Sequence, residues 1–88
     1  MLDKKIKDAL IKKFQTHKDD TGSPQVQIAI LSEEINELSD HLKIHRKDYH
    51  SRRGLLQKVG NRRRLLRYLE AEDPKGYQDL IDKLKIKR

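Results

Sequence analysis

The feature that most restricts how this chain can fold is a row of apolar side chains between residues 24 and 44. These side chains recur at alternating intervals of three and four residues. Such intervals place them along one side of an α-helix and are typical of a helix that packs against another helix. We therefore predict a helix over residues 24–44 that needs a helical partner. The row consists of Ile28, Leu31, Ile35, Leu38 and Leu42.

The segment that follows supplies this partner. Three of its five leucines and its valine fall within about 80° of one another on a helical wheel, which predicts a helix over residues 49–72 with one apolar face. Only a polar break at residues 45–48 separates the two helices, so we expect an antiparallel hairpin. The apolar face is Leu55, Val59, Leu66 and Leu69, while Arg53, Gly60, Arg64 and Tyr68 point away from it and Arg67 lies at its edge.

Two short helices are predicted at the ends of the chain, over residues 3–16 and 74–85. Ser23-Pro24 and Asp73-Pro74 each combine a capping side chain with a proline suited to the first helical position. No segment alternates as a β-strand would. The sequence therefore predicts an all-α fold of four helices in a single domain, residues 1–88. The apolar faces of the end helices are Ile6, Leu10 and Phe14, and Tyr77, Leu80, Ile81 and Leu84.

The composition limits what such a fold can do. Hydrophobic residues make up 34% of the chain and charged residues 40%, so the core is expected to be a thin seam between helices. The absence of cysteine excludes disulfides and thiolate chemistry. The N-terminal residues lack the apolar core of roughly 7–15 residues that a signal peptide needs, and no apolar run approaches about 20 residues. We expect a cytoplasmic protein that makes no membrane contact and is a monomer when free.

Positive charge is concentrated in residues 41–67. This stretch holds ten of the 21 Lys and Arg residues and one acid, Asp48, so its net charge is +9 and the other residues sum to −2. Such a concentration favours a nucleic-acid partner over a merely solvated helix face. Arg62 and Arg63 flank the apolar face and are equally suited to pairing with acids of residues 24–44. Guanidinium groups that match phosphate oxygens come from Arg52, Arg53, Arg62, Arg63, Arg64 and Arg67.

Three of the four histidines lie in or near the predicted turn. His41 and His45 are four residues apart, as in many metal sites, but no clear third and fourth ligands accompany them, so we expect no metal or other cofactor. A nuclease would use two histidines as acid and base, yet a polar turn offers no closed pocket. Contacts with base edges, riboses or base faces suit these histidines better. We therefore expect no catalytic residues and no enzyme activity.

Asp48 is the single acid among the ten bases. Its position before residue 49 suits a helix cap. Its carboxylate can also accept hydrogen bonds from the amino groups of bases, which arginine cannot do. Ser51, one turn further on, can donate or accept at the same surface. The two roles of Asp48 are compatible.

Two glycines inside the helix predicted over 49–72 need a reason, because each costs about 1 kcal/mol relative to alanine. A bare backbone permits close approach, which we assign to the neighbouring helix at Gly54 and to a ligand at Gly60.

Tyr68 and the polar residues around the turn before residue 24 can each be interpreted as functional or as purely structural. Tyr68 can stack on a base or bond a ribose, or can be partly buried. Thr21, Gly22 and Gln27 offer polar groups near a helix N-terminus, which suits either an anion site or an ordinary turn.

Two long motifs give the sequence a specific resemblance. DTGSPQVQIAIL and HLKIHRKDYHSRRGLLQKVGNRRRLLRYL closely resemble the bacterial small-subunit ribosomal protein S-fifteen family, and the similarity extends through Asp73-Pro74 to the closing LIDKLKIKR. This resemblance implies a four-helix, non-enzymatic protein that binds the central domain of small-subunit ribosomal RNA early in assembly. It also implies neighbouring ribosomal proteins as partners, a nearby contact with the large subunit and, in some members, binding to their own messenger RNA.

The resemblance also implies two RNA sites. One is a three-way junction, and the other is a shallow minor groove with a G·U/G·C element, in keeping with the accessible groove of A-form RNA. Arg52, Arg53 and Arg67 are expected to make weaker contacts with the RNA backbone. The junction residues would be Thr21, Gly22, Gln27, Arg64 and Tyr68, and the groove residues His41, Asp48 and Ser51 with His45 nearby.

Three positions depart from the family pattern. Glu34 and Ala71 stand where some relatives carry basic residues, and Tyr49 replaces a frequent histidine. The first two are expected to weaken the junction contacts or shift them onto Arg64 and Arg67. The alternative to ribosomal RNA binding is a helical DNA-binding protein, because basic helices also enter the major groove of DNA.

Overall fold

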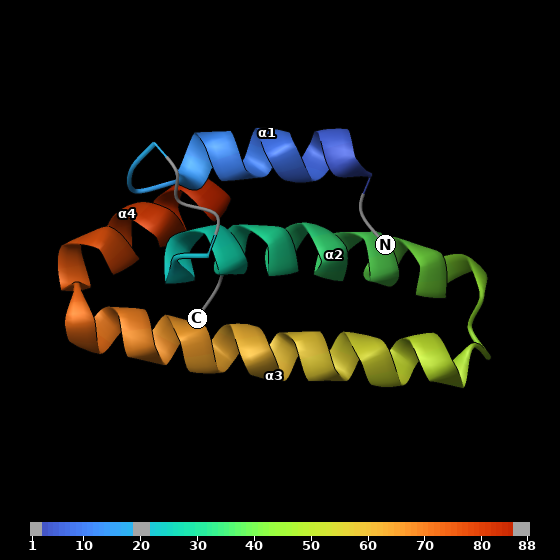
Figure 1. Ribbon diagram of the computed structural model, residues 1–88. Coiled ribbons are helices and arrows are strands. Elements are labelled where there is room, and N and C mark those ends of the chain that lie inside the picture. The colour runs from blue at the N-terminus through green and yellow to red at the C-terminus, as the bar shows by residue number, and fades with distance from the viewer. Residues whose placement is uncertain (1–2, 19–21, 86–88) are drawn as a thin grey trace.

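A computed structural model describes residues 3–18 and 22–85 of the chain. Within these ranges it contains four α-helices: α1 (Lys4–Phe14), α2 (Pro24–Ile44), α3 (Tyr49–Glu72) and α4 (Pro74–Leu84). α2 and α3 lie side by side and antiparallel, α1 covers the other side of α2, and α4 folds back from the end of α3 toward the start of α2 (Figure 1). The predicted all-α fold with a central hairpin is confirmed.

The starts of α2 and α4 depend on local caps that the sequence predicts. The Ser23 hydroxyl accepts from the Val26 amide at 3.3 Å, with Pro24 as the first residue of α2. The Asp73 carboxylate accepts from the Gly76 amide at 3.1 Å at the start of α4. Each cap satisfies an amide that has no partner within its helix, which explains why α2 and α4 begin where predicted.

The end helices are shorter than predicted. α1 begins at Lys4 rather than residue 3, because Asp3 is its cap and accepts from the Lys5 amide. It ends at Phe14, two residues early, because Gln15 is extended with φ −61° and ψ 146°. α4 ends at Leu84 instead of residue 85, since Lys85 adopts a left-handed conformation with φ 54°.

The core lies at one end of the hairpin, where all four helices meet. Ile28 and Val26 are fully buried there. On α1 only Phe14 is buried and Leu10 is half-buried, whereas Ile6 is 43% exposed, so the predicted apolar face of α1 packs along only part of its length. The buried cluster consists of Phe14, Val26, Ile28, Ala29, Leu69, Tyr77, Leu80 and Ile81.

The seam between α2 and α3 is only partly buried. Ile35 and Leu38 of the predicted row are buried, but Leu31 and Leu42 are half-buried. On α3 only Leu69 is buried, and the other predicted contact residues are half-buried. α2 buries side chains beyond the predicted row. Two of them belong to the cluster where α1 and α4 pack on α2, and the third faces Arg62 of α3. These additional buried residues are Val26, Ala29 and Ser32.

Polar contacts between α2 and α3 hold the middle of the hairpin together. Arg62 donates from Nη1 to the hydroxyl of buried Ser32 at 3.2 Å, and burial lowers the pKa of this arginine. Lys58 pairs with Glu34 at 3.4 Å, and both side chains are largely covered. Arg62 therefore has the structural role, although its partner is a hydroxyl and not the expected acid, and Arg63 is exposed.

The glycines of α3 are not required by packing within the described residues. A Cβ placed on Gly54 or Gly60 would meet no atom within 4 Å. The predicted close approach of α2 to Gly54 is therefore wrong. Gly60 is exposed, as its position on the helical wheel predicts. In the described ranges no helix is both long and apolar enough to cross a membrane.

Candidate nucleic-acid interface

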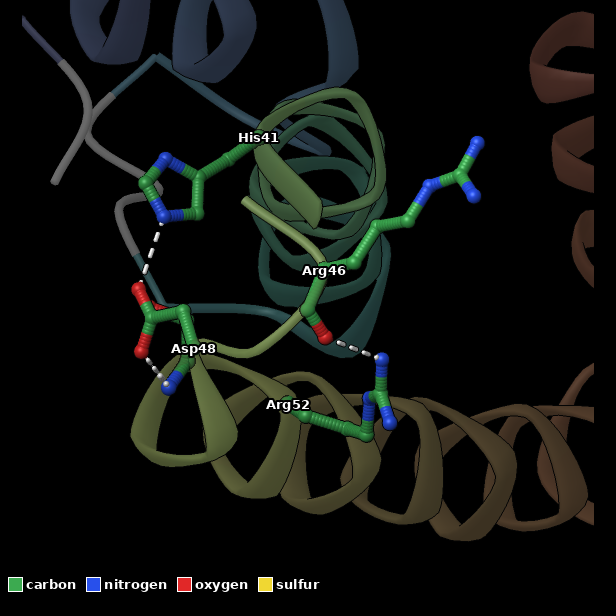
Figure 2. A network of polar contacts seen from close by, with 5 residues as sticks. His41, Arg46, Asp48 and Arg52 are labelled. Carbon is green, nitrogen blue, oxygen red and sulfur yellow. Dashed lines mark hydrogen bonds and ion pairs between the residues drawn. The ribbon is translucent and has the colours of Figure 1, made fainter. Parts of the chain in front are cut away.

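The turn between α2 and α3 is built around the Asp48 carboxylate. Its Oδ1 accepts from the Ser51 amide at 3.0 Å, which caps α3 as predicted. Its Oδ2 accepts from the Ser51 hydroxyl at 2.7 Å and lies 2.8 Å from Nε2 of His41 at the end of α2 (Figure 2). One carboxylate thus joins the last turn of α2 to the first turn of α3.

The hydrogen bond to Asp48 determines which nitrogen of His41 carries a hydrogen. An ionised carboxylate can only accept, so Nε2 must donate, and Nδ1 of a neutral ring is then an acceptor. Figure 2 shows Nδ1 on the side of the ring away from Asp48. The His45 ring lies 4.5 Å from the His41 ring, centroid to centroid, tilted by 31°. With a neutral His41 ring, the turn presents an acceptor nitrogen beside a second imidazole.

Hydrogen bonding keeps Asp48 ionised. The Ser51 hydroxyl, the Ser51 amide and the His41 ring all favour the charged form and hold the pKa of Asp48 well below its usual range. The side chains of His41 and Asp48 remain 40% and 33% exposed. The network is consequently a charged, solvent-accessible surface that a ligand can reach.

An arginine also holds the turn. Arg52 donates from Nη2 to the backbone carbonyl of Arg46 at 2.9 Å, as Figure 2 shows. Its guanidinium lies 5.8 Å from the centre of the exposed Tyr49 ring. Arg52, expected only to contact an RNA backbone, therefore has a local structural contact as well, whereas Arg53 and Arg67 are simply exposed.

A second surface is the groove between α2 and α3 toward the core end of the hairpin. It encloses about 480 Å³. Gln27 on its wall donates from Nε2 to the Gly22 carbonyl at 2.7 Å. Arg64 on the opposite wall donates to Oδ1 of Asn61, one turn earlier on α3. This groove joins the start of α2 to the basic part of α3.

The structure sorts the predicted site residues into these two surfaces. His41, His45, Asp48 and Ser51 come together at the turn. Gln27 and Arg64 share the groove, and Gly22 is connected to it through Gln27. Tyr68 is 56% exposed and is not part of the groove wall. Thr21 lies outside the described residues.

Sequence reasoning missed three members of the groove, namely Ile30, Asn61 and Leu65. Asn61 precedes Arg64 by three residues, a helical spacing that predicts neighbouring side chains and could have drawn attention to it. Leu65 was not included in the apolar face of α3, yet it is half-buried and lines the groove floor. Across residues 3–18 and 22–85, no group of three or more His, Cys, Asp or Glu side chains is placed to hold a metal ion.

The fold and the two surfaces define a small, basic, all-helical protein of the kind that binds nucleic acid. A profile of the family described as "Ribosomal protein S15" matches residues 7–87. The chain therefore belongs to the ribosomal protein S15 family, as its motifs predict. It is a structural protein and not an enzyme, and the nuclease alternative is excluded on that ground.

Bacterial relatives agree with this assignment. The chain is 54% identical over 87 residues to a protein of Limosilactobacillus reuteri (strain DSM 20016), covering 99% of this chain and 98% of the relative. It is 57% identical over 82 residues to one of Anoxybacillus flavithermus, covering 93% and 92%. It is 54% identical over 88 residues to one of Caldanaerobacter subterraneus subsp. tengcongensis, covering both completely. Each relative is named "Small ribosomal subunit protein uS15".

Proposed function

We propose that this protein is a structural constituent of the small ribosomal subunit that binds the subunit's RNA through two surfaces of the α2–α3 hairpin. The observation that carries the proposal is the hydrogen-bonded network at the turn, since it exposes oriented polar groups in the middle of the most basic stretch. Family membership, and the names of the bacterial relatives, support the ribosome as the place of action.

At the turn, we assign the network to reading the G·U/G·C minor groove. The amino group of guanine is the one donor in the minor groove of a standard base pair. Nδ1 of neutral His41 and the Ser51 hydroxyl oxygen are acceptors suited to it. Asp48 already accepts three hydrogen bonds. Its main part is therefore to orient His41 and Ser51, and a base amine reaches the one acceptor position that remains.

At the protein groove between α2 and α3, we assign Gln27, Arg64 and Gly22 to binding the three-way junction of the RNA. Thr21 and Tyr68 are added to this set from the family resemblance. Ser51 and Arg64 are 13 residues apart on α3, or roughly 20 Å along the helix axis. The two surfaces must therefore contact different parts of the RNA. A rigid hairpin that binds both fixes the angle between RNA helices, which is how it promotes early assembly of the central domain.

Arginines between the two surfaces complete this interface. Arg53 and Arg67 are exposed on α3 and suit contacts with the sugar–phosphate backbone. Arg52 is exposed too and suits the same contacts, although one of its N–H groups already donates to the Arg46 carbonyl. Contacts with neighbouring small-subunit proteins, with the large subunit and with the protein's own messenger RNA remain predictions from the resemblance.

Chemical footprinting on small-subunit ribosomal RNA tests this proposal. We expect protection at both a three-way junction and a nearby minor groove. Arg64→Ala should remove the protection of the three-way junction and leave the protection of the RNA minor groove. Lys12→Ala, which removes an exposed positive charge from α1, should leave both unchanged.

The competing DNA-binding function is tested by comparing this RNA with duplex DNA of equal length at one moderate salt concentration. Salt must be fixed because phosphate contacts make the affinity strongly salt-dependent. We expect the folded RNA to bind more tightly, and tighter binding to duplex DNA would overturn the proposal.

A further inference from the structure

The groove between α2 and α3 differs from the surface around it. Its floor is apolar, formed by Ile30, Leu31 and Leu65, all half-buried. Its rim is polar and belongs to both helices. A volume of about 480 Å³ lies within the roughly 300–1,000 Å³ of small-molecule sites. Such a hollow suits a flat, partly apolar group with hydrogen-bonding edges better than it suits a phosphate, which needs charge and no apolar floor.

Glu34 places a carboxylate in the wall of this groove. Its side chain is only 13% exposed and pairs with Lys58 at 3.4 Å. The ammonium group of Lys58 offsets the negative charge, so the groove does not repel the phosphates of an RNA strand. The carboxylate nevertheless remains an acceptor, because Lys58 occupies only part of its acceptor capacity. An acceptor of this kind in a basic surface selects a ligand that carries N–H donors.

The remaining rim residues supply complementary groups. Gln27 donates to the Gly22 carbonyl through Nε2, which leaves its amide oxygen to accept. Asn61 accepts from Arg64 through Oδ1, which leaves its amide nitrogen to donate. The guanidinium of Arg64 is planar, and guanidinium planes stack on bases. Donors, acceptors and a stacking surface therefore converge on one hollow.

We propose that this groove binds a single unstacked RNA base that carries an exocyclic amino group, with its face on the apolar floor and its amino group donating to Glu34. The ligand is thus an adenine, cytosine or guanine, and uracil is disfavoured because it lacks the amino group. This inference rests on the proposed function, which brings a junction strand to this surface. Unstacked bases at junctions and loops are the usual targets of sequence-specific RNA recognition.

The test begins with the unaltered protein and junction RNAs in which one junction nucleotide at a time is abasic. Burying the face of a base on the apolar floor contributes about 25 cal/mol per Å² of apolar surface, so one position should lose about fivefold or more in affinity. At that position, a base analogue that lacks only the amino group should recover the stacking and still bind several-fold more weakly than the natural base. This arm needs no protein variant.

The second arm identifies the acceptor. Glu34→Leu keeps the size of the side chain and removes the carboxylate. The preference for the amino-bearing base over its amino-free analogue should therefore disappear, so that the two RNAs bind with equal affinity. Glu70→Leu removes an exposed acid of α3 outside the groove and should keep the full preference. Thermal unfolding of both variants establishes that they are folded before binding is measured.

The outcomes separate this inference from the proposed function. Tight binding to the junction RNA with less than a twofold loss at every abasic position would overturn the base site and leave RNA binding intact. An unchanged preference in folded Glu34→Leu would overturn the role of Glu34. No binding to the junction RNA at all would overturn the proposed function and, with it, the base site.

Discussion

The two ends of the α2–α3 hairpin are held together by different forces. At the core end, side chains from all four helices are buried against one another around Ile28 and Leu69. At the turn end, Ile44 and Tyr49 are 79% and 67% exposed, and the two helices are joined by hydrogen bonds to Asp48. Apolar burial thus holds one end, and a single carboxylate organises the other.

This difference separates stability from recognition. Burial is non-directional and tolerates small displacements, so it suits the end that determines the fold. Hydrogen bonds depend on distance and angle, so they orient donors and acceptors for a ligand. A thin-cored protein with 40% charged residues can therefore present an ordered polar surface without burying it. Substitutions at the two ends should have effects of different kinds.

The largest effect on stability is expected from Ile28→Ala at the core end. Ile28 is fully buried, and its truncation leaves a cavity that should lower the free energy of unfolding by about 2–5 kcal/mol. Urea denaturation measures this change. Leu56→Ala, at a site that is 66% exposed, is the matched control and should change the free energy little. Similar losses for both variants would remove the contrast between the core and the surface of the hairpin.

The next effect is on RNA discrimination at the turn end. Asp48→Ala removes the acceptor that orients His41 and Ser51, so the preference for the G·U/G·C element over a mutated element should fall on the order of tenfold. Its effect on unfolding should be smaller than that of Ile28→Ala. Binding titrations with the two RNAs measure the preference, and an equal loss on both RNAs would contradict the reading role.

Gly60→Ala sharpens the comparison because it should separate stability from binding in one residue. The new methyl group has open space around it, so α3 should gain up to about 1 kcal/mol, while close approach of an RNA strand is hindered. Gly54→Ala has the same open space and should stabilise α3 without weakening binding. If both variants bind RNA as the unaltered protein does, Gly60 has no part in the interface.

The smallest effect is the pH dependence contributed by the turn. The folded-state pKa of Asp48 is depressed, so its stabilising contribution is present above the ordinary carboxyl pKa of about 3.9 and is lost as pH falls below it. Unfolding followed between about pH 5 and pH 2 should therefore show a steeper loss of stability for the unaltered protein than for Asp48→Asn.

Ser51→Ala provides the intermediate case in the same pH series. It removes the hydroxyl that contributes most to the lowered pKa of Asp48 but keeps the amide and His41 contacts. Its pH dependence should lie between those of the other two proteins. Identical curves for all three proteins would show that the network adds nothing to stability.

The elements that sequence predicts well depend on contacts within a few residues. The bounds of α2 and α3, and the caps Ser23, Asp48 and Asp73, each depend on groups about three residues apart. Such groups are positioned by helix geometry alone. The exposure of Arg53, Arg64 and Tyr68 follows from the same geometry. Sequence by itself thus determined the helices, their polarity and the basic stretch over residues 41–67.

Only the tertiary structure decided which distant groups meet. The bond between His41 and Asp48, the Arg62–Ser32 contact and the groove around Glu34 each depend on how α2 and α3 are rotated against one another. Helical periodicity leaves this rotation open by tens of degrees, which is enough to bring Leu65 into the groove. Packing of α1 and α4 on α2 restricts it further, because α2 must then bury more than one face.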